Sequence, residues 1–155
     1  MEKTSVTGFS PAMQRKGKGK GSAAHFPGLT YGTEPVKHAT EARLLGVWYD
    51  EAFNFSRHIA EVHAKLSERF KVFKSLSGTS WGCHRRTLRT LYLSLMQSCA
   101  DFALPAYAPF VGGDALKHVA KIEKDASMHV GGFVTRTRIT AIYGEAGTRP
   151  IGIRA

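Results

Sequence analysis

The sequence predicts an α+β protein in which a short, incomplete β region is followed by a helical bundle of three to four helices. The first fifty residues contain short runs of β-branched and alternating residues, which are typical of strands. From Ser56 onward, apolar residues instead recur at intervals of three and four, which is the period of an amphipathic helix. The chain has 155 residues, of which 43% are hydrophobic, so it can bury one core of ordinary size.

Three short strands are expected in the β region. The first covers residues 4–10 and ends at Pro11, the second covers residues 26–31, and the third and strongest covers residues 43–49. Between the first two lies a basic Gly/Lys loop, residues 15–22, in which Gly and Lys alternate. Such a segment repels itself and cannot pack, so we expect a flexible loop there.

Two helices follow. The first is capped by Asn54 or Ser56 and ends at Gly78. Its apolar stripe consists of Ile59, Val62, Leu66, Phe70 and Phe73. The second helix runs from His84 to about Ser98, and its inner face consists of Leu88, Leu91, Leu95 and Cys99. Trp81, in the Gly-rich turn between them, is expected to fill the core between the two helices.

Two further helices are expected after an irregular connection at Pro105 and Pro109. Asp114 is the expected N-cap of the third helix, which Gly131 and Gly132 terminate. Its inner positions are Leu116, Val119, either Ile122 or Glu123, Ala126 and Val130. A short fourth helix starts after Thr137, carries Ile139, Ile142 and Tyr143, and ends before Gly147.

The charge balance favours a polyanionic partner. The chain has 22 Lys and Arg against 12 Asp and Glu, a formal charge of +10, and nucleic acid is the first candidate. Lysines 117, 121 and 124 are offset by Asp114, Glu123 and Asp125, so they are expected to form a solvated face. The candidate nucleic-acid-binding residues are those without such an offset or on the polar flank of the first helix: Lys65, Arg69, Lys74, Arg85, Arg86, Arg89, Arg15, Lys16, Lys18 and Lys20.

The three arginines at the start of the second helix are the sharpest of these candidates. Arg85, Arg86 and Arg89 have no acidic residue nearby in the sequence. They also oppose the helix dipole, whose N-terminal end favours anions rather than cations. A bound phosphate would relieve this conflict.

Several classes of protein are excluded by the composition. The longest mostly apolar stretch, residues 99–111, is interrupted by Asp101 and two prolines, so no membrane span and no membrane partner are expected. No secretory signal follows Met1, and the expected location is intracellular, nuclear or cytoplasmic. Cys83 and Cys99 are too few for a disulfide framework or a zinc finger. No catalytic residue, metal ligand or cofactor site is indicated by residue spacing.

A series of short segments, in register along the chain, resembles the C-terminal palm-end and thumb part of a reverse transcriptase from a non-LTR retrotransposon of the LINE type, similar to ingi and jockey elements. The segments are Lys3-Thr4 with Phe9-Ser10, residues 44–50 (LLGVWYD), residues 55–59 (FSRHI), residues 78–82 (GTSWG), residues 86–92 (RTLRTLY), residues 145–147 (EAG) and Pro150-Ile151. The resemblance extends over nearly the whole chain.

This resemblance implies roles for particular residues. Lys3 lies where the family has a late palm lysine, and Leu45 and Gly46 lie in the hairpin that grips the primer terminus. It also implies three parts: residues 1–52 as a residual palm-end and primer-grip segment, residues 53–147 as a helical, thumb-like domain, and residues 148–155 as a tail. The partner implied is RNA, DNA or a hybrid, and a protein that pairs with the exposed strands is a further candidate.

The departures from the family concern its catalytic centre. Family polymerases hold two Mg²⁺ ions on palm aspartates that include an adjacent Asp-Asp pair, and this chain contains no such pair. Its adjacent acids, Asp50 and Glu51, follow the primer-grip segment. We therefore expect a fragment that is not an enzyme on its own and binds nucleic acid through basic helices. The alternative is a structural RNA-binding or interaction subunit recruited into a larger assembly.

Overall fold

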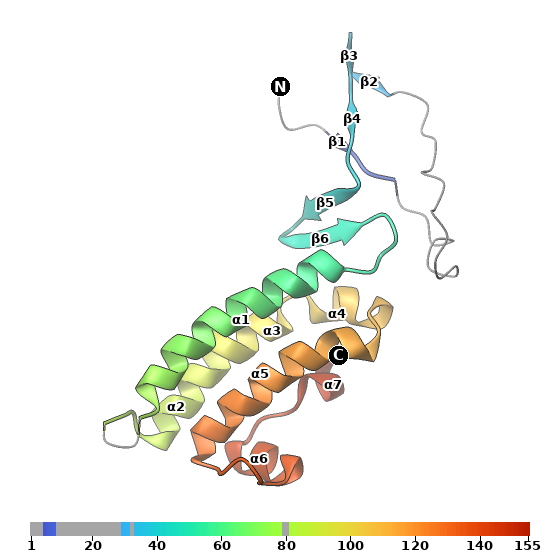
Figure 1. Cartoon of the computed structure of the whole chain (residues 1–155). Coiled ribbons are helices and arrows are strands. Elements are labelled where there is room, and N and C mark those ends of the chain that lie inside the picture. Colours follow the sequence, from blue (N-terminus) through green and yellow to red (C-terminus); the bar gives the residue numbers. More distant parts are fainter. Residues whose placement is uncertain (1–4, 9–28, 32, 79–80) are drawn as a thin grey trace. The chain divides into compact units, whose positions relative to one another are not determined.

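The fold is α+β, as the sequence predicts. A computed structural model of the chain describes residues 5–8, 29–31, 33–78 and 81–155 (Figure 1). The chain divides into two compact units, Met1–His58 and Ile59–Ala155, which are described separately. The expected parts, residues 1–52, 53–147 and 148–155, stay a prediction, and the basic loop at residues 15–22 lies outside the described residues.

The first unit contains three small sheets of two strands each. The strand β1 (Ser5–Val6) pairs in parallel with β4 (Lys37–His38). The antiparallel pairs are β2 (Thr30–Tyr31) with β3 (Glu34–Pro35), and β5 (Glu41–Leu44) with β6 (Val47–Asp50). Each strand therefore has one paired neighbour among the described residues.

The prediction of one continuous strand at residues 43–49 is wrong, because a tight turn divides it into β5 and β6. Leu45 and Gly46 form this turn with φ values of 50° and 88°. Positive φ at both central residues belongs to the two-residue turns that match the twist of a hairpin. The β-branched and aromatic pattern continues through both strands, so it does not reveal the turn.

The hairpin is held to the start of the first long helix, α1 (Ser56–Leu76). The Arg57 guanidinium lies 3.6 Å from the centre of the Trp48 ring and forms an ion pair with Glu41. The Phe55 backbone N–H donates to Asp50 Oδ1 at 3.1 Å. These contacts join both strands of the hairpin to the first turn of α1.

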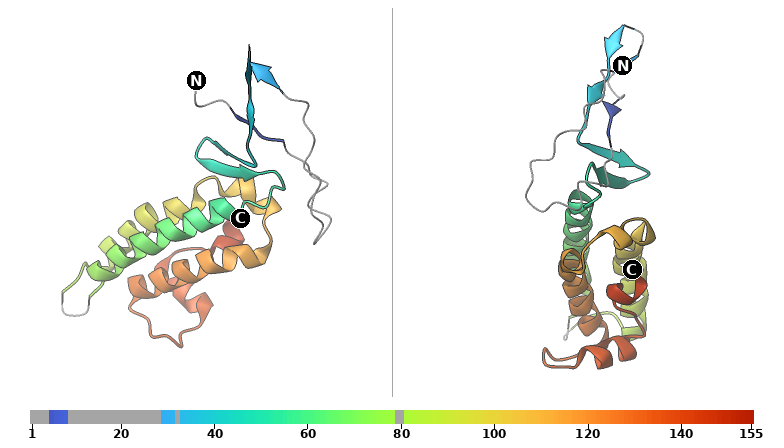
Figure 2. Two further views of the ribbon diagram at one scale, coloured as in Figure 1. Left: turned by 45° about the horizontal axis from the view of Figure 1, so that its top comes forward. Right: turned by 90° about the vertical axis from the view of Figure 1, so that its right-hand side faces the viewer.

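The second unit is helical (Figures 1 and 2). After α1, the helix α2 (Arg85–Leu91) continues through a π-helical segment, η2 (Tyr92–Gln97), into α3 (Ser98–Asp101). Then follow α4 (Leu104–Tyr107), a 3₁₀ turn, η3 (Ala108–Phe110), and the helices α5 (Gly113–Gly131), α6 (Ile139–Ala146) and α7 (Ile151–Arg154). Figure 2 shows α1 and α5 in one layer, with the α2–α3 helix and α7 in the other. No helix in the described part of the chain is long and apolar enough to cross a membrane.

The apolar stripe predicted for α1 is largely confirmed, whereas the inner face of the next helix is shifted. Ile59, Val62, Leu66 and Phe73 are buried, and Phe70 is half-buried. In the helix formed by α2, η2 and α3, the buried residues are Leu88, Tyr92, Met96 and Ala100 instead of the predicted set beyond Leu88. The π-helical segment explains the difference, since its wider turn keeps residues four apart on one face.

Two other local predictions are corrected, and one alternative left open by the sequence is decided. Gly112, rather than Asp114, is the N-cap of α5, and Asp114 lies in the first turn. Of the two inner candidates on α5, Glu123 is buried and Ile122 is half-buried. Trp81 is 69% exposed and does not fill the core. Spacing places residues on a face, but it does not show which polar residue has a buried partner.

A buried ion-pair network joins α3, α5 and α7. Arg154 donates from Nη2 to Glu123 Oε1 at 2.6 Å and from Nε to Asp101 Oδ1 at 2.8 Å. It also donates to the backbone carbonyl of Arg149. Burial raises the pKa of Glu123, while the attraction of Arg154 opposes this rise. The segment expected as a tail thus contains a helix whose arginine is bonded in the core.

We predict that Arg154→Met destabilises the helical unit by about 3–5 kcal/mol, because it leaves the fully buried Glu123 carboxylate without its partner. The double variant Arg154→Met with Glu123→Leu should regain most of this loss, since no buried charge remains. Denaturant unfolding monitored by circular dichroism measures both. Equal losses for the single and the double variant would contradict this account.

Candidate nucleic-acid interface

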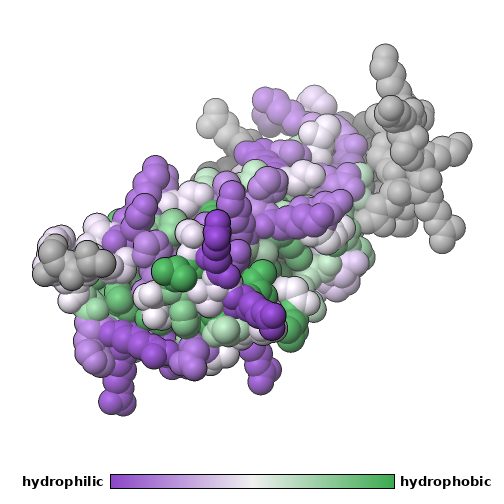
Figure 3. Space-filling view, turned by 60° about the horizontal axis from the view of Figure 1, so that its bottom comes forward, coloured by the Kyte–Doolittle hydropathy of each residue, from purple (hydrophilic) through white to green (hydrophobic). Residues whose placement is uncertain are grey.

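The helical unit carries most of the positive charge of the chain. Residues 59–155 contain 14 Lys and Arg against seven Asp and Glu, a net charge of +7. On the face shown in Figure 3, hydrophilic side chains project between small apolar patches. The contacts of each basic residue decide which of them can reach a ligand.

Two of the three α2 arginines bind the C-terminal end of α6. Arg85 Nη2 donates to the Glu145 carbonyl at 2.6 Å and lies 3.3 Å from the Glu145 carboxylate. Arg89 donates from Nε to the Ala146 carbonyl and from Nη2 to the Gly147 carbonyl, both at 3.0 Å. These carbonyls belong to the end of α6 and its C-cap, where helix carbonyls have no partner within the helix.

This arrangement gives Arg85 an acidic partner, although no acidic residue lies near it in the sequence. Glu145 is sixty residues away in the sequence, so local spacing could not reveal it. The negative end of the α6 dipole supplies the favourable field for Arg85 and Arg89 that a phosphate was expected to provide. Both side chains therefore have a structural role, whether or not a nucleic acid also contacts them.

Arg86 differs from its two neighbours. It is exposed, and its side chain has no ion pair or hydrogen bond among the described residues. Its backbone N–H donates to Nδ1 of the N-cap residue His84 at 3.3 Å. The guanidinium at position 86 is thus available to a polyanion in the described structure.

The three candidates on α1 lie on two edges of the helix. Lys65 forms an ion pair with Glu61 at 2.9 Å, and Arg69 Nη1 donates to the Leu95 carbonyl at 2.6 Å. Successive helical residues are rotated by about 100°, so Lys65 and Arg69 are about 40° apart and Lys74 is about 140° from Arg69. A ligand that binds one side of α1 therefore cannot contact Lys65, Arg69 and Lys74 equally.

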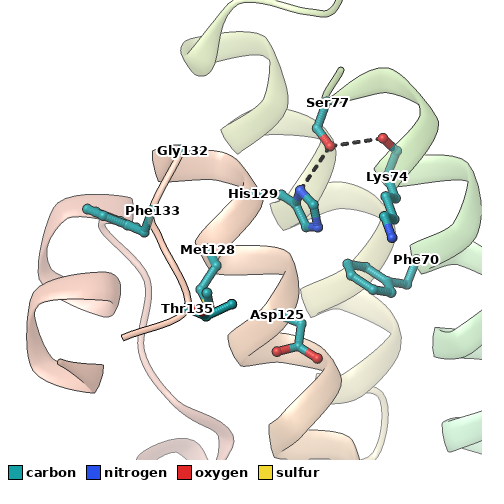
Figure 4. A pocket seen from close by; sticks show the side chains of 9 residues that line it. All are labelled: Phe70, Lys74, Ser77, Asp125, Met128, His129, Gly132, Phe133 and Thr135. Carbon is teal, nitrogen blue, oxygen red and sulfur yellow. Dashed lines mark hydrogen bonds between the residues drawn. The ribbon is translucent and has the colours of Figure 1, made fainter. Parts of the chain in front are cut away.

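Lys74 lies beside a groove between the C-terminal parts of α1 and α5 (Figure 4). The groove has a volume of about 460 Å³. Ser77 Oγ is 3.2 Å from His129 Nδ1, and the rings of Phe70 and His129 are 5.6 Å apart. Burial and the Lys74 ammonium lower the pKa of His129, and the Asp125 carboxylate opposes this shift. Sequence spacing missed this group, since its residues come from two distant helices.

The primer-grip candidates form the tip of the β5–β6 hairpin in the first unit. Leu45 is 89% exposed, and its neighbour Leu44 is 60% exposed. Leu45 also adopts a left-handed backbone conformation, which costs a non-glycine residue about 1–2 kcal/mol. An exposed apolar residue held in an unfavourable conformation is a feature of contact sites as well as of tight turns.

Several predicted residues lie outside the described part of the chain: Lys3, Arg15, Lys16, Lys18 and Lys20.

The three lysines of α5 were expected to be offset by three acids, and this offset is incomplete. Asp114 pairs with Lys117 at 2.5 Å, but Glu123 faces the core and bonds Arg154. The described residues contain no group of three or more His, Cys, Asp or Glu side chains that could hold a metal ion.

Comparison with known proteins supports a retrotransposon-related origin. Over 88 residues, 57% of this chain, the sequence is 25% identical to a 115 kDa protein of the type-1 retrotransposable element R1DM from Drosophila melanogaster. The chain spans 9% of that protein's length. No protein-family model and no solved structure matches the chain.

The contacts at α6 predict different effects for two neighbouring arginines. Arg89→Ala should lower the free energy of unfolding by about 1 kcal/mol or more, because the α6 carbonyls lose a charged donor. Arg86→Ala, a matched change three residues earlier on the same helix, should leave it within about 0.5 kcal/mol. Thermal and urea unfolding test both, and equal effects would argue against the capping role.

Proposed function

We propose that this chain is a fragment resembling the RNA-directed DNA polymerase, or reverse transcriptase, of a non-LTR retrotransposon, and that its helical unit binds the backbone of a nucleic-acid duplex or hybrid. The observation that carries the binding proposal is the exposed Arg86 beside the anchored Arg85 and Arg89. The two anchored arginines add positive charge to the surface and fix the start of α2. Arg86 can then contact a phosphate without disrupting a contact of the fold.

The type of recognition follows from the chemistry of these groups. Arginine and lysine side chains bind phosphates through charge and hydrogen bonds and carry no base information in such contacts. Binding should therefore depend strongly on salt and weakly on sequence. The similarity to a protein of a retrotransposable element supports nucleic acid as the polyanion.

The proposal includes a primer-grip-like role for the hairpin tip at Leu45 and Gly46. The exposure of Leu45 and its left-handed conformation support a contact at this position. No Mg²⁺ chemistry is proposed for this chain, because the family's paired palm aspartates have no counterpart in its sequence.

A second candidate function is a structural RNA-binding or interaction subunit within a larger assembly. The pairing of each described strand with a single neighbour favours it, because the remaining strand edges could pair with another chain. The two candidates differ in what lies upstream: an intact palm with its Asp-Asp pair, encoded in frame before this segment, supports the polymerase origin.

Salt dependence tests the nucleic-acid interface. Arg86→Gln should reduce the slope of log K against log salt by about 0.9 for duplex DNA, because one phosphate contact is lost. Fluorescence anisotropy of a labelled duplex and of an RNA–DNA hybrid, titrated between low and moderate salt, measures the slope. We choose Arg86 alone, since replacing Arg85 or Arg89 would also disturb α6.

Lys117→Gln is the matched control for this experiment. It removes the same charge from an exposed position on α5, where Asp114 already pairs with the lysine. Its salt slope should equal that of the unchanged chain. If Arg86→Gln and Lys117→Gln give the same slope and affinity, the proposed interface on α2 is wrong.

The absence of paired aspartates predicts that the chain does not extend a primer on an RNA or DNA template, because two-metal catalysis requires clustered carboxylates. A primer-extension assay of the purified chain with Mg²⁺ or Mn²⁺ measures this. Extension that is lost on replacing Asp50 or Glu51 would overturn the prediction.

A further inference from the structure

We propose that the groove between the C-terminal parts of α1 and α5 binds a single unpaired nucleotide, with the base against the aromatic side chains and the phosphate at Lys74. This inference rests on the proposed function, because it assigns a site for an unpaired residue of the same nucleic acid. It concerns different residues from the α2 arginines, so the two proposals can fail separately.

The size and lining of the groove suit a nucleotide. Its volume of about 460 Å³ lies within the range of small-molecule sites. Three of its lining residues carry flat rings: Phe70 on α1, His129 on α5, and Phe133 in the loop after α5. Figure 4 shows Phe70 and His129 beside each other, with Lys74 on the same side of the groove. Aromatic side chains of this kind provide stacking surfaces for unpaired bases.

The hydrogen bonds around Ser77 define the protonation of His129. The Ser77 hydroxyl donates to the Lys74 carbonyl at 2.9 Å, so its oxygen accepts from His129 Nδ1–H. Because burial lowers the pKa of His129, the imidazole is neutral at pH 7 and Nε2 is an acceptor. In Figure 4 this second nitrogen points away from Ser77.

The polar groups of the groove indicate which bases it prefers. His129 Nε2 and the Asp125 carboxylate both accept hydrogen bonds. Adenine and cytosine carry an exocyclic amino group whose two N–H donors can serve both acceptors, whereas uracil and thymine have no amino group and offer a single ring N–H on this edge. The groove should therefore bind adenine or cytosine nucleotides more tightly than uridine nucleotides.

Lys74 is the group that makes an anion acceptable here. The groove lies at the C-terminal ends of two helices, where the helix dipoles disfavour negative charge. Lys74 is exposed and has no ion pair among the described residues, so its ammonium can bind a phosphate. Since the helix dipoles disfavour a phosphate at this place, replacing Lys74 should weaken nucleotide binding.

Amide NMR of the full chain, titrated with AMP, UMP and ribose 5-phosphate, tests the site. AMP should shift the signals of residues 70–77 and 125–135 in a saturable manner. UMP should bind more weakly, and ribose 5-phosphate, which lacks the base, should produce little change. The spectrum also reports whether each variant is folded.

Two variants that each remove one positive charge test whether the phosphate binds at Lys74. Lys74→Gln should weaken AMP binding by about three- to tenfold, because a charged hydrogen bond to phosphate is lost. Lys117→Gln, on α5 but not among the residues that line the groove, should leave AMP binding unchanged.

Three results would overturn the proposal: no saturable shifts at residues 70–77 and 125–135, equal shifts with ribose 5-phosphate and AMP, or equal AMP affinities for the two variants. Duplex binding separates the two proposals. If AMP binds in the groove but the chain binds no duplex, the groove proposal is supported and the proposed duplex interface is wrong. If duplex binding depends on Arg86 while AMP does not bind, the groove proposal fails alone.

Discussion

The helical unit depends on one buried charge pair, Arg154 with Glu123. Glu123 is fully buried in the middle of α5, and an isolated carboxylate there would cost several kcal/mol. Arg154 compensates this charge and extends the same contact to Asp101 on α3. Arg154 therefore fixes how α3, α5 and α7 pack together. The helix α5 in turn contacts α6, α2 and η2.

The arginines of α2 also hold the fold together through contacts with a distant part of the chain. Arg85 and Arg89 satisfy carbonyls at the end of α6, so two of three adjacent basic residues serve the fold before they serve a ligand. Because both are anchored, Arg86 is presented on a helix whose position is fixed at that end. A basic cluster in a sequence thus separates into structural and available residues only when its contacts are known.

The groove beside Lys74 arises from the arrangement of α1 and α5. The C-terminal ends of α1 and α5 lie side by side there, and the Lys74 ammonium, in the last turn of α1, complements the dipole of its helix. Phe70 contacts His129, and Ser77 fixes the orientation of its imidazole. The chemical character of the groove, with one cation, two acceptors and three rings, depends on residues from α1, from α5 and from the loop after α5, which are far apart in the sequence.

The sequence by itself determined the α+β class, the position of α1 and its buried stripe, the ends of α5 and α6 at glycines, and the excess of positive charge. These are local properties, set by periodicity, helix termination and composition. Residue patterning did not show the turn at Leu45 and Gly46, although the resemblance to reverse transcriptases implied a hairpin there. Only the tertiary structure decided that a π-helical segment shifts the buried face of the α2–α3 helix, and that Glu123 rather than Ile122 faces the core. It also decided which arginines are anchored. The physical reason is that the partners of Arg85, Arg89 and Glu123 lie between 31 and 60 residues away, and sequence spacing carries no information about contacts at that separation.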